Sequence, residues 1–164
     1  MSIFYAELDA GMEKLVDAAD RRILRELQRD SSRTVTEIAD AVGLSHAPCW
    51  RRIQRLRADG YILRECAIVD RSKLCWDMEF FVYLKFSAQG RGNVFEFRRR
   101  MMAHDRVIGA YIVLGNYDLM LHIVARGMRD YEEFYLENLS GRAELADINS
   151  MTVMSALKEA QVPV

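Results

Sequence analysis

The chain has 164 residues and a mass of 19.0 kDa, enough for one domain or for two small ones. Its apolar fraction of 51% and charged fraction of 29% exclude disordered and collagen-like classes, and its three cysteines show no C-x-x-C spacing. No apolar run reaches the roughly 20 residues of a membrane helix, and Glu7 and Asp9 stand where a secretory signal would be basic. We therefore expect a cytoplasmic protein with reduced thiols and no membrane partner.

Two capped helices open the ordered part of the sequence. Asp17-x-x-Asp20 offers an N-cap and an acidic first turn, and apolar residues follow at helical spacing. Thr34-x-x-Glu37 is a capping box that predicts a second helix. Gly43 can adopt the left-handed conformation that ends this helix and turns the chain sharply.

A third helix is expected from the cap at Ser45 to about Ala58. Cys49, Ile53 and Leu56 fall on one side of it at 100° per residue and define its buried face. Together with the preceding helix and the glycine turn, it predicts a helix-turn-helix. The β-prone stretch 61–69 then predicts a wing strand.

The second half alternates between strand and helix patterns. Gly115-Asn116 separates two of the strand patterns as a hairpin turn. The order β-α-β-β-α-β predicts a ferredoxin-like domain, so the fold class is α+β. The expected elements are strands over 78–86, 107–114, 117–125 and 149–157, and helices from Asn93 and over 128–139. The expected divisions are an N-terminal extension (1–14), a winged helix-turn-helix (15–64), a linker (65–77) and the βαββαβ domain (78–164).

The third helix carries the clearest functional signal. Five arginines stand against Asp59 between Ser45 and Arg64, a local charge of +4 on a chain whose net charge is −1. Such a patch suits phosphates and base edges, and the N-terminal part of a recognition helix enters the major groove. A solvated arginine-rich face without function is the alternative. Trp50 lies between the two faces of the helix, and for it the alternative is that it closes the small core. We expect base contacts from Ser45, His46, Ala47, Trp50 and Arg51, phosphate contacts from Arg52 and Arg55, and a DNA-facing Gln54.

Three segments in this order resemble the leucine-responsive/AsnC (feast/famine) family of transcription regulators. The run 20–30 is similar to the family's first helix. The run 42–56, with its Pro48-Cys49 pair, is similar to its recognition segment. Gly115-Asn116-Tyr117-Asp118 is similar to its G-D-(F/Y)-D turn. The resemblance covers about residues 15–160.

The resemblance implies a cytoplasmic homo-oligomer that binds double-stranded DNA and senses a small effector, usually an amino acid. Dimers would form largely through the C-terminal sheets and assemble to tetramers or octamers, with the effector in a cleft between dimers. A glycine turn exposes backbone donors to a carboxylate, and Asp118 is suited to an α-ammonium group. Asp118 acting only as a turn cap is the alternative. By position, the effector-binding candidates are Gly115, Asn116, Tyr117 and Asp118, and then Met128, Met151, Thr152 and Val153.

Two other functions are weighed against this one. Asn116 replaces the family's more frequent aspartate, which keeps open a ligand-independent architectural DNA-binding protein. Sirohaem decarboxylases resemble the family in both halves, but they need histidines or arginines around a tetrapyrrole, and only His104 and His122 stand out here. No catalytic pair, cofactor motif or metal-ligand spacing is recognisable. We expect no catalysis, no cofactor and no metal.

Overall fold

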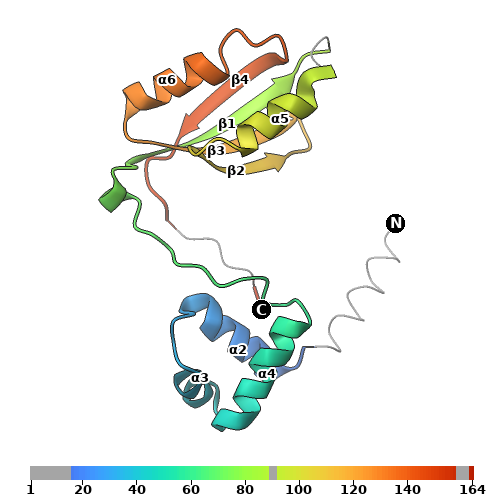
Figure 1. Cartoon of the computed structure of the whole chain (residues 1–164), viewed down its shortest axis with the longest axis vertical. Coiled ribbons are helices and arrows are strands. Elements are labelled where there is room, and N and C mark those ends of the chain that lie inside the picture. The colour runs from blue at the N-terminus through green and yellow to red at the C-terminus, as the bar shows by residue number, and fades with distance from the viewer. Residues whose placement is uncertain (1–15, 89–91, 158–162) are drawn as a thin grey trace. The chain divides into compact units, whose positions relative to one another are not determined.

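The computed structural model describes residues 16–88, 92–157 and 163–164, and these form two compact units (Figure 1). The division lies between Ala67 and Ile68, inside the stretch 65–77 expected to be a linker. Val164 belongs to the first unit, where its carbonyl accepts a hydrogen bond of 2.6 Å from Arg25 Nε. The expected N-terminal extension, 1–14, lies outside the described residues.

The described part of the first unit contains the expected three helices. The predicted N-cap at Asp17 and the predicted capping box at Thr34 both form, and each is a complete capping box: the side chain accepts from the third backbone N–H of its helix, and the cap's own N–H donates to the third side chain. Gly43 has φ +70° and ends the second helix in the left-handed conformation. Ser45 occupies the N-cap of the third helix without a side-chain capping bond. The helices are α2 (Ala18–Arg29), α3 (Val35–Val42) and α4 (His46–Ala58).

The three helices meet in a small apolar core. Cys49 is fully buried there, and burial raises the pKa of its thiol. The predicted buried face of α4 is therefore confirmed, and the remaining sides of α4 stay available to solvent. The core consists of Ile23, Ile38, Ala39, Val42, Cys49, Ile53 and Leu56.

The predicted wing strand is wrong. Residues 61–69 form no strand in the structure. The backbone N–H groups of Tyr61 and Ile62 both donate to Leu56 O, which ends α4, and their side chains pack on the helical core. A β-prone composition forms a strand only where a neighbouring strand takes its hydrogen bonds, and no described strand of this chain lies beside it.

The second unit confirms the βαββαβ order. Its sheet has the strand order β2-β3-β1-β4, and every neighbouring pair is antiparallel. The last strand was expected over 149–157 but lies earlier, because its extent follows its partner β1: Leu145 pairs with Phe86 and Thr152 with Phe80. The elements are β1 (Met78–Phe86), α5 (Val94–Met102), β2 (Val107–Ile112), β3 (Leu119–Ala125), α6 (Met128–Asn138) and β4 (Leu145–Thr152).

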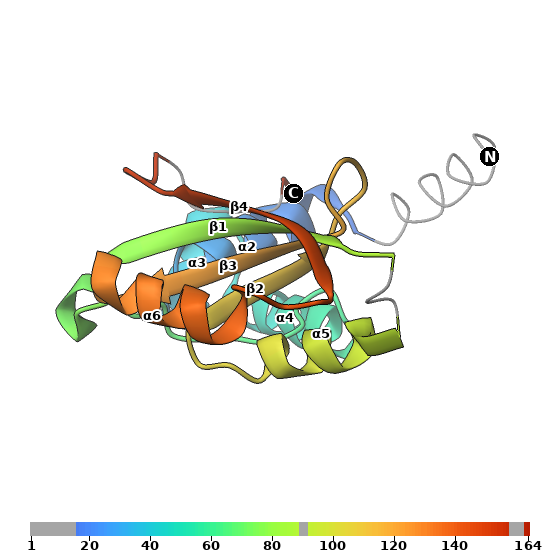
Figure 2. The same ribbon diagram turned by 90° about the horizontal axis from the view of Figure 1, so that it is seen from above.

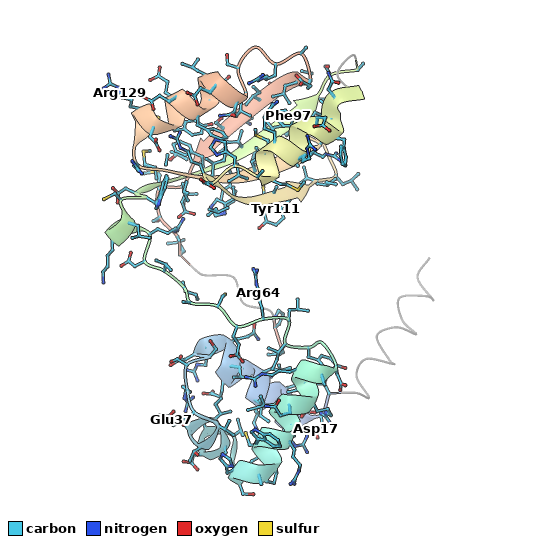
Figure 3. All side chains as sticks on the ribbon, in the orientation of Figure 1. Asp17, Glu37, Arg64, Phe97, Tyr111 and Arg129 are labelled. Atoms are coloured by element: carbon cyan, nitrogen blue, oxygen red, sulfur yellow. The ribbon has the colours of Figure 1, made fainter. Side chains whose placement is uncertain are left out.

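Both helices of this unit cover the same face of the sheet (Figure 2). Phe97 of α5 and Phe134 of α6 are fully buried against the alternate residues of the central strands that point to them. The opposite face carries the intervening side chains and no helix of the described unit. Tyr111 points away from the helices on that face (Figure 3), and it is half exposed. The helix-free face also bears Phe81, Tyr83 and Met120.

Candidate nucleic-acid interface and effector site

The predicted base-contacting residues lie together on the exposed N-terminal half of α4. Ser45, His46 and Ala47 are exposed at its first turn. One turn further, Trp50 has 48% of its surface exposed, so it does not close the core, and Arg51 is exposed beside it. This arrangement offers a groove-sized helix face with apolar and cationic groups side by side.

The two arginines predicted to contact phosphates are held by carboxylates of α2. Arg52 donates to Asp17 Oδ2 at 2.6 Å and to Asp20 Oδ1 at 2.9 Å, and Arg55 donates to the other oxygen of Asp20. Figure 3 shows Asp17 beside α4. The backbone N–H of Asp20 and then the Arg52 guanidinium lower the pKa of Asp17 to about 2. The two carboxylates in turn raise the pKa of Arg52. Gln54 is partly exposed on the same helix.

These pairs reduce the local charge that the sequence suggests. Arg57 also has a partner, Glu65. With Asp17, Asp20 and Glu65 added to Asp59, four carboxylates stand against five arginines, so the local charge is +1 rather than +4. Arg51 forms no ion pair with any residue that the structure describes, which makes it the available cation at the centre of the face.

Sequence reasoning missed the role of Asp20. The sequence pattern assigns it to the acidic first turn of a helix, yet its carboxylate is buried and joins two helices. A signal was present: Asp20 is three positions before the buried Ile23, so both lie on the same side of α2. Arg52 and Arg55 are likewise three apart, the spacing at which two side chains can share one carboxylate.

The first group of effector candidates lies in the loop between β2 and β3. Gly115 has φ +143°, a conformation that favours glycine. Asp118 fixes the loop to β1, because its N–H donates to Leu84 O at 2.9 Å and its Oδ2 accepts from Phe86 N at 2.8 Å. The Asp118 carboxylate therefore has a structural role, although its partner lies on β1 and not in the turn that it was expected to cap. Asn116 is exposed, and the ring of Tyr117 lies 5.7 Å from that of Tyr83.

The second group lies at the other end of β1. Thr152 pairs with Phe80, and the Val153 N–H donates to Glu79 O at 2.9 Å. Met151 and Met128 both have more than half of their surface exposed. Phe80 and Phe86 are six residues apart on one strand, about 20 Å. One amino acid therefore cannot touch both the Asp118 carboxylate, beside Phe86, and Thr152, beside Phe80, within a single copy.

Three charged residues fix the start of α6 and hence Met128. Asp130 accepts from the Arg126 N–H at 3.0 Å and pairs with Arg106 at 2.7 Å. The Arg126 guanidinium lies 5.2 Å from the ring centroid of Trp76. This network fixes the backbone at the start of α6, where Met128 is the first residue.

The histidines do not converge on a site. His122 lies 2.6 Å from Glu79 Oε2 on the helix-free face, whereas His104 packs edge-on against Phe134 of α6. Arg71 and then His122 hold the pKa of Glu79 below its usual range. Within the described ranges, no group of three or more His, Cys, Asp or Glu is placed to hold a metal ion. The same ranges contain no helix long and apolar enough to span a membrane.

Comparison with known proteins identifies both units. An AsnC-type helix-turn-helix domain matches residues 16–57, and an Lrp/AsnC ligand-binding domain matches residues 79–163. The chain belongs to the Lrp/AsnC family. The sequence resemblance is thereby confirmed for both halves of this Lrp/AsnC protein.

Individual Lrp/AsnC proteins match along almost the whole chain. The leucine-responsive regulatory protein of Rhizobium meliloti is 32% identical over 88% of this chain and 93% of its own. The transcriptional activator DecR of Escherichia coli is 28% identical over 88% and 95%. The crystal structure of an AsnC family regulator from Agrobacterium tumefaciens superposes with a TM-score of 0.80 at 32% identity, covering 90% and 95%. These relatives are transcription regulators, so this Lrp/AsnC protein is a DNA-binding regulator and not an enzyme.

A more distant likeness concerns ligand-bound structures. A regulator from Neisseria meningitidis, crystallised as a complex with L-Met, matches with a TM-score of 0.79 at 22% identity, covering 88% of this chain and 93% of its own. At this identity the likeness concerns the fold alone, which the two proteins share.

Proposed function

We propose that the protein is a sequence-specific regulator that binds DNA in the cytoplasm through the exposed N-terminal half of α4. The supporting observation is the position of Trp50 and Arg51, which are exposed on a helix whose opposite side is buried in the core. Ser45, His46 and Ala47 complete the base-contacting surface. A dimer presents two such helices, so its operator is roughly palindromic.

An amino-acid effector bound between copies controls this activity. The supporting observation is the separation along β1 of the Asp118 carboxylate from Thr152, since the loop of one copy and the Met128 end of another can together enclose one small ligand. The apolar side chains of the helix-free face, among them Phe81 and Tyr83, favour a dimer built through the sheets, and such dimers assemble further to tetramers or octamers around the effector. L-methionine, found in the Neisseria meningitidis complex, is the first ligand to test.

The ligand test is a thermal-shift screen of the intact protein against the twenty amino acids. A ligand that binds only the folded form raises the melting temperature in a concentration-dependent way. Asp118→Asn is the sharp variant, because its amide oxygen can still accept from Phe86 N while the negative charge that pairs with an α-ammonium group is lost. We expect it to keep the unliganded melting temperature and lose the shift.

A ligand-independent architectural protein is the other outcome of this screen. It would show no shift with any amino acid, together with weak preference among DNA sequences. The observation in favour of this function is Asn116. It stands where the family more often has an aspartate, so the loop carries one carboxylate fewer.

A further inference from the structure

Asp20 is unusual among the charged residues of the first unit. Its side chain is 1% exposed, and its two oxygens divide between Arg52, at 2.9 Å, and Arg55. Oδ2 also accepts the Asp17 N–H at 3.1 Å. A buried carboxylate is stable only when it is paired and hydrogen-bonded, so Asp20 and the two arginines hold one another in place.

The fixed arginines still face solvent. Their side chains are 31% and 44% exposed for Arg52 and Arg55, and each gives a single terminal nitrogen to the carboxylates. A guanidinium has five N–H donors, so both keep donors for a further anion. With Pro48 and Arg51 they line a hollow of about 300 Å³ on α4. One water molecule occupies about 30 Å³ in the liquid, so the hollow has the volume of several waters. That is enough room for a phosphodiester group.

We propose that this hollow seats one DNA backbone phosphate, and that Asp20 is the positioning residue that holds Arg52 and Arg55 ready for it. The inference rests on the proposed DNA-binding function. It adds the place of one backbone contact and a role for a buried acid that does not touch DNA. Because the two side chains are already ordered, binding need not pay to immobilise them.

The proposal makes a counterintuitive prediction about charge. Removing a carboxylate near DNA strengthens binding if only net charge matters. Asp20→Asn should do the opposite, since it releases the two arginines from the hollow. Asp59→Asn is the matched control, because it removes one exposed carboxylate from the end of the same helix and disturbs no ion pair of the described residues.

The probe is a duplex that the wild-type protein itself selects from a random-sequence pool, with an unselected duplex beside it. We expect Asp20→Asn to lower affinity for the selected duplex by about tenfold, the usual loss for one charge-assisted hydrogen bond. Asp59→Asn should leave affinity unchanged or slightly raised. Thermal unfolding and far-UV circular dichroism confirm that each variant is folded. If folded Asp20→Asn binds as tightly as Asp59→Asn, Asp20 does not position the arginines.

Arg55→Gln tests the hollow while Arg52 keeps its pairing with Asp17 and Asp20. Losing one phosphate contact should reduce the slope of log affinity against log salt by about 0.9 per bound copy, on both duplexes. An unchanged slope overturns the phosphate site. Failure of the wild-type protein to bind any duplex would instead contradict the proposed function, so the two failures are distinguishable.

Discussion

Two variants that each fail to bind the effector alone should bind it again when their subunits are mixed in one oligomer. The first is Asp118→Asn, which removes the loop carboxylate. The second is Met128→Glu, which places a negative charge at the exposed first turn of α6, where the helix dipole tolerates it. Each homo-oligomer carries the same defect in every site. In an equal mixture with random exchange, a site that takes its loop from one copy and its Met128 end from another is intact in about a quarter of cases.

The assay is titration calorimetry with the amino acid found by thermal shift, on variants refolded together from denaturant. The expected stoichiometry is about one quarter of the wild-type value, with wild-type affinity at the restored sites. Variants refolded separately and then combined without exchange are the control. If the mixture recovers no sites, both groups act within one copy, and the 20 Å separation along β1 has been interpreted wrongly.

Three further predictions concern DNA contact, stability and pH. Arg51→Ala should relax preference at one base position at a cost of about 1–3 kcal/mol, whereas Arg57→Ala, already paired with Glu65, should leave preference unchanged; binding to single-base variants of the selected duplex measures both. Phe134→Ala should lower the free energy of unfolding by about 3–5 kcal/mol in urea titration, and a loss below 1 kcal/mol would contradict its place in the core. Asp17, whose pKa falls from 3.8 to about 2 on folding, stabilises the protein above pH 4 and loses that contribution as pH falls toward 2. Asp17→Asn should make the free energy of unfolding depend less on pH in that interval. An unchanged pH dependence would show that the carboxylate does not contribute.

The helices and caps were predictable because their signals are local. The pattern Thr34-x-x-Glu37 followed by Gly43 contains within ten residues the groups that begin and end α3. The buried side of α4 likewise follows from the 100° rotation per residue applied to Cys49, Ile53 and Leu56. In such segments the chemistry that decides the structure is adjacent in sequence.

The errors arose where the structure of a segment depends on a partner that is distant in the sequence. The stretch 61–69 has the composition of a strand but no strand beside it, whereas residues 145–148 begin β4 because β1 pairs with them. The same reason hid the role of Asp20, whose arginines lie more than 30 positions away. The two ends of β1 also became distinct only with the strand register, which showed that the effector candidates fall into two groups.

The chain's two tryptophans happen to lie one in each unit. Trp50 is on the exposed half of α4, and Trp76 lies against Arg126 just before α6. Replacing either one by phenylalanine therefore leaves a single fluorophore, which reports DNA contact in one variant and events near the effector candidates in the other. Titrating DNA at several effector concentrations, and effector at several DNA concentrations, then gives the coupling free energy between the sites twice over. Thermodynamic reciprocity requires the two values to agree when both titrations are done on the same variant.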